Sequence, residues 1–460
     1  MANKRKIFFR ADAGSNIGYG HYIRSLALAD MLKQDFDCTM FTQTPTDYQL
    51  RECESVCPIV ALQDDDSKFE KFLDYLHGDE IVVLDNYFFT TDYQQAIKAK
   101  GCKLVCIDDM HNKHYVADIV INHGCTDASL FDIEPYTQLC LGMNYALLRR
   151  PFRNPKQHER VPNSYAICFG GADYHNLTYA YAKELSKQHC TIIAVVGDSY
   201  QHEDTLRSLP NIEIRKRLSA DEMAILFSSV ENIICSASTT CYEALACGAR
   251  VYAGWYVENQ KDIYHLLASN HQIVPLDNLQ DVKKIAPSAI EPVRFPKSHD
   301  ALWRVFMQLA WRIVDYRDLT EEESRTIWEQ RNKEQIRQWM KNDQLIPWEN
   351  HCAFMHNLKT NDTKRYYAFF LGDQFLASYD IIDIHDNEAE CGLYLNASHE
   401  GKGLASMVQT RMEQKAREVG IHLLRSEVLP NNTASLRFFT RNAFVETKRD
   451  SELVYLEKKI

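Results

Sequence analysis

The 460-residue sequence predicts an α/β protein whose domains are built on largely parallel sheets. Short apolar runs alternate with segments of helical periodicity over the first 300 residues, as in repeated strand–helix units. Polar residues directly follow most of these runs, which is expected where parallel strands deliver side chains to one sheet edge. A glycine-rich loop also separates the first run from the first helix. At ~150 residues per domain, the length suits two to four domains.

The first apolar run, residues 7–9, predicts a buried strand, and the periodicity after it predicts a helix starting near His21. Gly20 and the glycines before it allow the backbone to approach a ligand closely. A helix start also offers free N–H groups and a positive dipole end. The spacing fits neither the dinucleotide fingerprint nor the Walker motif. His21, with Asp12 and Arg24 nearby, therefore marks a candidate site, and a plain turn with a surface histidine is the alternative.

The composition limits the partners and the compartment. The net charge of −11 gives no support to nucleic acid or an anionic membrane as a partner. The 14 cysteines are scattered, without a C-x-x-C pair, which suits reduced thiols better than disulfides or a zinc site. The chain runs directly into its first strand, and no apolar run is long enough to span a bilayer. We therefore expect a cytoplasmic protein without a bound metal.

Polar side chains end three further apolar runs of the first third of the chain. These runs lie at residues 82–84, 104–107 and 119–121. Because parallel strands meet at one edge, we expect the side chains that follow the first two runs to share a rim with His21: Asp85, Tyr87, Asp108 and Asp109. The alternative role of the aspartates is to cap the helices that come next.

A second strand–helix series follows a polar, proline-bearing stretch at residues 149–162, which we interpret as a linker. The first strand of this series ends in a tight turn at Gly171. Another strand leads into Ser236–Thr240, and a helix starts there and carries Glu243 one turn on. Converging hydroxyls and free amides suit a phosphate, and Glu243 could accept hydrogen bonds from ribose hydroxyls. An ordinary Ser/Thr helix cap is the alternative.

The last third of the chain reads as a separate unit. Residues 299–314 predict an amphipathic helix, and a new unit starts near residue 319 with further helices. Its remaining predicted elements, in order, are strands at 366–371, 375–379 and 390–395, a helix from the loop 399–406 to 416, a strand at 423–428 and a helix from 431 to 439.

Taken together, the motifs of residues 1 to about 315 resemble the PseG family, the nucleotide-sugar hydrolases of pseudaminic acid biosynthesis. The matching motifs stand in the family's order: Arg10-Ala-Asp-Ala13, Gly18-Tyr-Gly-His21 with Arg24, Asp85-Asn-Tyr87, Ile107-Asp-Asp109, Leu141-Gly142 through Leu148, Phe169-Gly-Gly-Ala-Asp173 with Asn176, Ser236-Ala-Ser238 with Glu243, and Asn259-Gln260. The resemblance implies a GT-B-like pair of Rossmann-like domains. Residues 1–155 would hold the sugar and the catalytic histidine, and residues 156–316 would hold UDP.

The resemblance also implies the reaction, the metal-independent, inverting hydrolysis of UDP-2,4-diacetamido-2,4,6-trideoxy-β-L-altropyranose to the free sugar and UDP. Neutral imidazole suits water activation near pH 7, so His21 is the expected base. Tyr87 and Asn259 would position water and sugar. Asp12 either orients His21 or is buried structure. The expected substrate contacts of this part are Asp12, Gly20, Arg24, Gly171, Ser236, Ser238, Thr239, Glu243 and Gln260.

Residues 319–460 resemble the GNAT acyltransferases. The segment Glu400–Ala405 stands where that family has R/Q-x-x-G-x-G/A, whose amides hold the pyrophosphate of acetyl-CoA. Glu400 replaces the usual Arg or Gln, and Ala443 a common Gly. Phe439 stands where the family often has a tyrosine that protonates the leaving thiolate, so another residue or water does this. The expected cofactor contacts are Leu395, Gly401, Lys402, Gly403, Leu404, Ala405, Ser406 and Asn432.

The opening of this unit, with Trp328 and Arg331-Asn332, resembles PseH, the acetyltransferase of the same pathway. PseH acetylates the 4-amino group of the UDP-sugar, and its product is the substrate of PseG. Arg331 and Asn332 would contact this substrate. Glu390 could accept the proton of the amine through water, and its alternative is a surface strand residue.

We therefore expect a bifunctional enzyme that binds a UDP-amino sugar and acetyl-CoA and exists as a monomer or homodimer. One alternative keeps the GT-B architecture but transfers the sugar to an acceptor, which would give a glycoside instead of a free sugar. The other alternative is a degenerate GNAT domain that only binds nucleotide sugar or scaffolds a partner, and Phe439 is the feature behind it.

Overall fold

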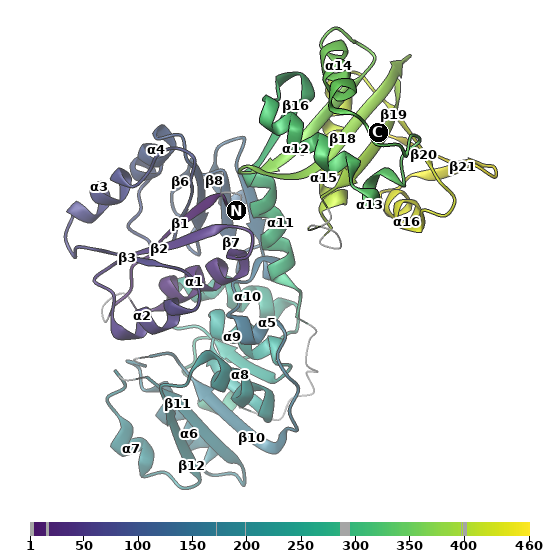
Figure 1. Ribbon diagram of the computed structural model, residues 1–460. Helices are drawn as coiled ribbons and strands as arrows, with labels where there is room; N and C mark the ends of the chain where they lie inside the picture. The colour runs from purple at the N-terminus through teal and green to yellow at the C-terminus, as the bar shows by residue number, and fades with distance from the viewer. Residues whose placement is uncertain are drawn as a thin grey trace. The chain divides into compact units, whose positions relative to one another are not determined.

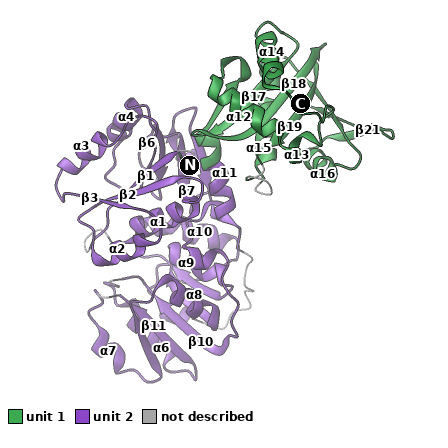
Figure 2. Cartoon of the chain, in the orientation of Figure 1, with its two compact units in different colours: residues 1–4, 306–460 green, residues 5–305 purple. Residues whose placement is uncertain are grey.

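The computed structural model describes residues 4–14, 18–171, 173–197, 199–285, 295–396, 398 and 403–460. The chain forms two compact units, residues 5–305 and residues 306–460 (Figure 2). No helix of the described residues is both long and apolar enough to cross a membrane. Each unit has its own sheets and its own core.

The first sheet of residues 5–305 is parallel, with the strand order β3-β2-β1-β4-β5-β7-β9. Figure 1 labels β1, β2, β3 and β7 of this sheet and the helices α1 to α4. The chain adds β2 and β3 on one side of β1 and then β4 and the later strands on the other side, which makes a topological switch point between β1 and β4, where ligands bind in open α/β sheets. Its strands and helices are β1 (Lys6–Arg10), α1 (Gly20–Leu32), β2 (Asp37–Gln43), α2 (Asp47–Glu54), β3 (Ile59–Leu62), α3 (Ser67–Asp74), β4 (Ile81–Leu84), α4 (Thr91–Ala99), β5 (Lys103–Ile107), β7 (Ile119–Asn122) and β9 (Gln138–Leu141). A small parallel pair, β6 (His114–Tyr115) and β8 (Asp132–Ile133), stands beside it.

The second sheet of this unit repeats the arrangement with the order β12-β11-β10-β13-β14-β15, also parallel. Its switch point lies between β10 and β13, so the residues after β13 stand at the corresponding ligand position. Its elements are α5 (Arg150–Arg153), β10 (Val161–Cys168), α6 (Leu177–Leu185), β11 (Thr191–Val196), α7 (Glu203–Arg207), β12 (Ile212–Lys216), α8 (Ala220–Ser229), β13 (Val230–Ser236), α9 (Thr239–Ala246), β14 (Arg250–Gly254), α10 (Lys261–Ser269) and β15 (Val274–Pro275).

The C-terminal unit has one sheet with the order β16-β17-β18-β19-β20-β22-β21, antiparallel except for the pair β19 and β20. Its elements are β16 (Trp311–Asp315), α12 (Glu321–Asn332), α13 (Glu334–Arg337), α14 (Trp348–Leu358), β17 (Arg365–Leu371), β18 (Gln374–His385), β19 (Glu388–Leu395), α15 (Leu404–Glu418), β20 (Leu423–Val428), α16 (Thr433–Arg441), β21 (Val445–Arg449) and β22 (Val454–Lys459).

Local signals in the sequence explain several of these boundaries. Capping boxes start α2, α8 and α12, where a Ser or Thr accepts from the third backbone N–H and a Gln or Glu returns the bond. All four residues of β4 are buried, as expected for a central parallel strand. Gly124, after β7, has a packing role, because a Cβ there would lie 2.8 Å from Ile263 of α10. The loop after β7 and the helix α10 therefore approach closely at this glycine.

The predicted fold class, α/β with two parallel-sheet halves and a third α/β unit, is confirmed, and the GT-B-like pairing of the halves stays a prediction. One predicted helix is wrong at its end. α11 (Ser298–Ala310) stops before Trp311, and residues 311–315 form β16, which pairs with β17. β16 is only five residues long, and the helical pattern before it hides so short a strand. The first strand of the C-terminal sheet thus precedes residue 319.

Candidate functional site

The imidazole of His21, at the start of α1, is fixed by Asp85. His21 Nδ1 lies 2.7 Å from Asp85 Oδ1, and Asp85 is the first residue after β4. A carboxylate at this distance accepts a hydrogen bond from Nδ1–H, which keeps the proton on Nδ1 and leaves Nε2 with its lone pair. The Asp85 carboxylate thus favours the tautomer of His21 that a general base requires.

Two further residues of α1 hold the carboxylate of Asp85. Arg24 donates to its two oxygens at 2.7 and 2.5 Å, and Ser25 Oγ donates at 3.1 Å. Arg24 also donates to Asp109, after β5, at 2.7 Å. Burial alone would raise the pKa of Asp85, but Arg24 and then His21 outweigh it and hold that pKa below its ordinary value. Asp85 is therefore charged near neutral pH and can stabilise a protonated imidazole.

Tyr87 and Asn259 join this cluster from the two halves of residues 5–305. The Tyr87 ring packs edge-on against the His21 ring, with centroids 4.6 Å apart. Asn259 Nδ2 donates to Tyr87 Oη at 2.7 Å and lies 3.5 Å from Asp109 Oδ2. A cavity of about 10 Å³, the room that one water molecule needs, is lined by His21, Arg24, Tyr87 and neighbouring residues. The arrangement can thus place a small nucleophile beside the imidazole.

Asp12 does not orient His21, which corrects one of the two roles left open for it. Its side chain is fully buried and pairs with Arg10, and it accepts from the backbone N–H of Gln43 at 2.8 Å. Asn86 accepts from the backbone N–H of Asp12 at 2.7 Å. Asp12 therefore ties the ends of β1, β2 and β4 together and has no exposed surface for substrate. Two other predicted residues lie nearby in the sequence elements of this half. Gly20 is the first residue of α1. The Asp108 carboxylate accepts hydrogen bonds from the backbone N–H groups of Met110 and His111 in the turn after β5.

The second candidate group stands at the switch point of the other sheet, where β13 leads into α9. Ser238 is the N-cap residue, but its side chain does not cap the helix. The ordinary-cap alternative is therefore wrong for Ser238. Ser236 Oγ lies 3.4 Å from Ser238 Oγ, and Thr239 opens α9. The helix start presents hydroxyls and backbone N–H groups together, which is an arrangement suited to a phosphate.

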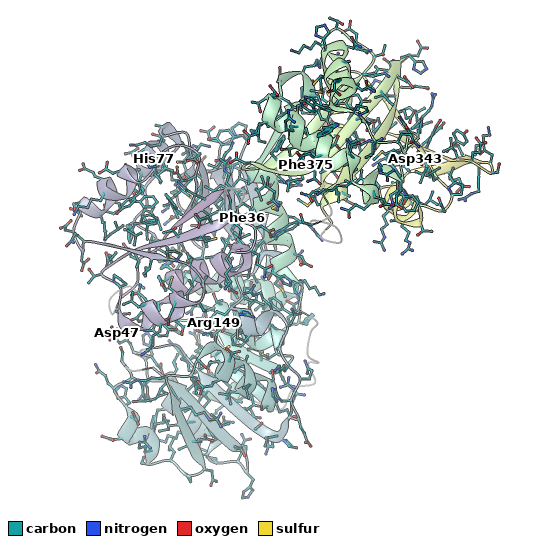
Figure 3. All side chains as sticks on the ribbon, viewed as in Figure 1. Phe36, Asp47, His77, Arg149, Asp343 and Phe375 are labelled. Atoms are coloured by element: carbon teal, nitrogen blue, oxygen red, sulfur yellow. The ribbon has the colours of Figure 1, made fainter. Side chains whose placement is uncertain are left out.

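Glu243, one turn into α9, is buried and already has a partner in this structure. Arg149, labelled in Figure 3, donates to both of its carboxylate oxygens, at 2.7 and 2.8 Å. Burial opposes the charge of Arg149, but Glu243 outweighs it and raises the pKa of that guanidinium. In the sequence, Arg149 stands at the start of the predicted linker and has no predicted role, because its partner lies 94 positions away. Glu243 as a ribose ligand stays a prediction.

Two other predicted substrate residues of this half are placed by the structure. Gly171, in the turn after β10, is exposed. A Cβ on Gly197 would lie 2.2 Å from the carbonyl oxygen of Gly171, so the two backbone segments can approach this closely only with glycine at position 197. Gln260 is buried, and its Oε1 accepts from the backbone N–H of Tyr256 at 3.0 Å, so this oxygen holds the turn before α10. Among the described residues, no group of three or more His, Cys, Asp or Glu side chains is arranged to hold a metal ion.

The sheet of the C-terminal unit contains a fork. β19 and β20 pair from Glu388 only to Glu390, although the described residues of β19 continue to Leu395 and those of β20 to Val428. Beyond the fork, Leu395 pairs with Ala377 of β18 on its other side. The β20-facing backbone groups of β19 after Glu390 are thus free to bind an extended ligand.

The start of α15 follows β19. Gly403 stands at the N-cap with a φ of 79°, a conformation that glycine adopts readily, and Leu404 behind it is buried. Ser406 Oγ accepts from Asn442 at 3.0 Å, and Ala405 stands beside it in the first turn. The predicted cofactor residues Gly401 and Lys402 lie outside the described residues.

Two asparagines that are predicted to bind ligands have side chains that form hydrogen bonds with backbone groups. Asn332 donates to the carbonyl of Ile346 at 2.9 Å and accepts from its N–H at 2.8 Å. Asn432 accepts from the N–H of Ser435 at 3.1 Å and so caps α16. Both side chains therefore have a structural role, while the predicted substrate contact of Asn332 and the predicted cofactor contact of Asn432 stay predictions. Pattern reasoning could not separate the two roles, because asparagine suits both.

Arg331, which is predicted to contact the substrate, has one guanidinium nitrogen without a hydrogen-bond partner among the described residues. Its Nη2 donates to the carbonyl of Asn342 at 3.1 Å, while Nη1 is buried and has no partner among the described residues.

Glu390, at the fork, accepts from Lys341 at 2.8 Å, and the same ammonium lies 2.9 Å from Glu427. Phe439 is buried between the rings of Phe438 and Phe444, each 4.9 Å away.

The comparisons with known proteins agree with this division. The family model described as an acetyltransferase (GNAT) domain matches residues 312–445. Acetyltransferase PseH of Campylobacter jejuni (strain NCTC 11168) is 26% identical over 146 residues, which cover 32% of this chain and 91% of that protein. The uncharacterized protein MJ1062 of Methanocaldococcus jannaschii is 23% identical over an alignment of 510 residues, which covers 98% of this chain and 99% of that protein.

The N-terminal region is similar to a hydrolase over almost all of that enzyme's length. The UDP-2,4-diacetamido-2,4,6-trideoxy-β-L-altropyranose hydrolase of Campylobacter jejuni is 30% identical over 276 residues, which cover 57% of this chain and 96% of that protein. The N-terminal part of this chain therefore belongs to the UDP-2,4-diacetamido-2,4,6-trideoxy-β-L-altropyranose hydrolase family, and a GNAT-family acetyltransferase domain follows it in the same polypeptide.

Proposed function

We propose that this chain catalyses two consecutive steps of pseudaminic acid biosynthesis. The first is acetyl-CoA-dependent N-acetylation of UDP-4-amino-4,6-dideoxy-N-acetyl-β-L-altrosamine. The second is hydrolysis of the product, UDP-2,4-diacetamido-2,4,6-trideoxy-β-L-altropyranose, to the free sugar and UDP. The single observation that carries the hydrolase proposal is the 2.7 Å contact between His21 and Asp85, since it prepares an imidazole to activate water. The names of the two Campylobacter relatives support the choice of substrates.

In the hydrolytic step, water attacks the anomeric carbon while His21 Nε2 takes its proton. Asp85 keeps the proton on Nδ1 and stabilises the imidazolium that forms. Tyr87 and Asn259 are bonded to each other beside the imidazole and would position the water and the sugar. The oxygen between sugar and phosphate leaves on the opposite face, so the anomeric configuration is inverted.

The leaving diphosphate gains negative charge as this bond breaks. The backbone amides of Ser238 and Thr239 stand at the start of α9, where the positive end of the helix dipole favours an anion. Because the Ser238 side chain does not cap α9, it does not compete with a bound phosphate for these amides. We propose that residues 1–155 and 156–316 form the two halves of a GT-B-like hydrolase that needs no metal.

Glu243→Gln should weaken UDP binding by about 1.5–3 kcal/mol, or roughly 10- to 150-fold in Kd. A carboxylate accepts hydrogen bonds from ribose hydroxyls with its full charge, and the amide lacks that charge. Isothermal titration with UDP measures the change. Glu258→Gln, at an exposed glutamate paired with Lys261, is the matched control. Unchanged UDP affinity in a folded Glu243→Gln protein would mean that Glu243 serves only to hold Arg149.

For the acetyl-transfer step, we propose that residues 319–460 with the preceding β16 bind acetyl-CoA. The N-terminus of α15 at Gly403 would hold its pyrophosphate, and the unpaired part of β19 would bind its extended arm. Arg331 Nη1, buried without a partner among the described residues, is available to an oxygen of the acceptor sugar.

The test of the hydrolase proposal is a product assay with the full chain and UDP-2,4-diacetamido-2,4,6-trideoxy-β-L-altropyranose in H₂¹⁸O. We expect free sugar and UDP in equal amounts, without an added acceptor, and UDP without ¹⁸O because water attacks carbon. Label in UDP would place the attack on phosphorus, and a requirement for an acceptor would make the protein a glycosyltransferase.

A further inference from the structure

The carboxylate of Asp380 occupies a space that the sheet of the C-terminal unit leaves open for it. Asp380 lies on β18, directly opposite Tyr366 of β17 and Gly392 of β19. A Cβ on Gly392 would lie 2.7 Å from Asp380 Oδ1, which is closer than real Cβ contacts. Only glycine at position 392 therefore leaves the Asp380 carboxylate where it is.

This carboxylate stands beside the fork between β19 and β20. Pairing of these two strands ends at Glu390, and Gly392 is the second residue beyond that point. Asp380 therefore faces the part of β19 that has lost its β20 partner. In the proposed reaction, this is where the thioester end of an acyl donor would lie.

The surroundings of Asp380 are rich in groups that bind hydroxyls and amines. Two positions before it on β18, on the same face of the sheet, Ser378 Oγ lies 2.7 Å from Tyr316 Oη, and Ser378 pairs with Tyr394. The unpartnered Nη1 of Arg331 lies in the same unit, and the charge of Arg331 influences Asp380. A hydroxyl-bearing amino sugar fits this chemistry.

Glu390, the sequence-based candidate for the proton acceptor, differs from Asp380 in one respect. Its carboxylate receives a hydrogen bond from the ammonium of Lys341 at 2.8 Å, so its charge is already paired. Burial and then the charge of Glu390 raise the pKa of Asp380 to about 7. A carboxylate of this kind accepts a proton near neutral pH, where a general base works best.

We propose that Asp380 is the group that removes the proton from the attacking amine in the acetyl-transfer reaction. This assignment rests on the acetyltransferase function proposed above and deepens it by naming the base. It replaces Glu390 in that role and leaves Glu390 with Lys341 at the fork.

The step balances as follows. The amine enters as R–NH₃⁺ and gives one proton to the Asp380 carboxylate. The freed lone pair forms the N–C bond to the thioester carbonyl, and the C–S bond breaks. The second proton of the nitrogen passes through water to the departing CoA thiolate, because Phe439 carries no proton to give. Asp380 then releases its proton to solvent, so the net products are the acetamide, CoA–SH and one H⁺.

The pH dependence gives a test that a purely structural role would not pass. Only the ionised carboxylate accepts a proton, so kcat for CoA release should fall as pH drops below about 7 and level off above it. The other titratable or charged groups described around Asp380 are Glu390, Lys341, Arg331, Tyr316, Tyr366, Tyr379, Tyr394 and Cys391. In Asp380→Asn, kcat should fall by roughly 10²–10⁴-fold, while acetyl-CoA binding persists. The acidic limb of the pH profile, which is the decrease of kcat below about pH 7, should be absent in this variant.

The experiment measures steady-state CoA release by the full chain with UDP-4-amino-4,6-dideoxy-N-acetyl-β-L-altrosamine and acetyl-CoA. Asp383→Asn, an exposed acid on the same strand, is the matched control and should keep the wild-type rate and pH limb. In Asp380→Ala, added formate should restore part of the rate in proportion to its concentration. This rescue decides the question even if Asp380→Asn loses acetyl-CoA binding.

Three results would overturn the proposal. The first is an Asp380→Asn protein with the wild-type kcat and the same pH limb. The second is loss of that limb in Glu390→Gln, which would return the role to Glu390. The third is an Asp380→Ala protein that binds acetyl-CoA but does not respond to formate. A wild-type chain that releases no CoA would refute the acetyltransferase proposal itself, and this is seen before any variant is compared.

Discussion

Replacing His21 with asparagine is expected to lower the rate of UDP-sugar hydrolysis by roughly 10²–10⁴-fold, the range for a lost general base. Asparagine is close in size to histidine and can still bond to Asp85, but its amide cannot take a proton from water. The substitution should leave UDP affinity unchanged, because the proposed phosphate and ribose contacts stand at α9. Steady-state UDP release and titration with UDP measure both quantities.

The acetyl-transfer rate of the same protein serves as an internal control, because His21 belongs to residues 5–305 and the GNAT domain to residues 306–460. His158→Asn, at an exposed histidine, is the matched control for the substitution itself. Hydrolysis at the wild-type rate in His21→Asn would refute the assignment of the base and, with it, the role given to the His21–Asp85 contact.

Asp85→Asn should have an effect of similar size for a different reason. A neutral amide no longer fixes the proton on Nδ1 of His21 and no longer stabilises the imidazolium, so hydrolysis should fall by roughly 10²–10⁴-fold. The substitution also removes one of the two carboxylates that pair with the buried Arg24. Breaking a buried pair in this way costs about 3 kcal/mol of folding free energy. Asp64→Asn, at an exposed position, is the control.

The stability effect of Asp85 has a defined pH dependence. Its pKa is lowered in the folded chain, so its contribution is fully present above the ordinary carboxyl pKa and is lost as pH falls through the lower folded value. Urea unfolding should therefore show a difference between wild type and Asp85→Asn at pH 7 that shrinks toward acid. A difference that stays constant down to strongly acidic pH would mean that the Asp85 charge does not stabilise the fold.

The central parallel strands can be predicted from sequence, because parallel strands buried on both faces are continuous apolar runs. The predicted strand at residues 119–121 lies within one residue of the limits of β7, and α1 starts one residue before the predicted His21. The strand β16 was missed because its five residues directly continue a helical pattern, and its pairing with β17 depends on residues more than fifty positions away.

The partners of the site residues were harder to predict than the residues themselves. His21 was identified by its place at a helix start after glycines, but its contact with Asp85 spans 64 positions and depends on β1 and β4 being neighbours in the sheet. Asp85 could be found only as one of several polar residues at strand ends. The pair Arg149 and Glu243, 94 positions apart, left no local signal at Arg149.

The C-terminal unit shows why a motif does not fix the role of each residue in it. Asn332 and Asn432 lie at motif positions, yet both side chains satisfy backbone groups. Asp380 belongs to no quoted motif, because its significance comes from Gly392 on the next strand and from the fork beyond Glu390. Such relations between strands appear only once the register is known.

The most direct test of the bifunctional proposal is one incubation of the full chain with UDP-4-amino-4,6-dideoxy-N-acetyl-β-L-altrosamine and acetyl-CoA, followed over time by mass spectrometry. The account predicts CoA, UDP and the free 2,4-diacetamido sugar, with UDP release that depends on acetyl-CoA. In His21→Asn, the acetylated UDP-sugar should accumulate instead. UDP release at the same rate without acetyl-CoA, or no acetylated species at any time, would contradict the account.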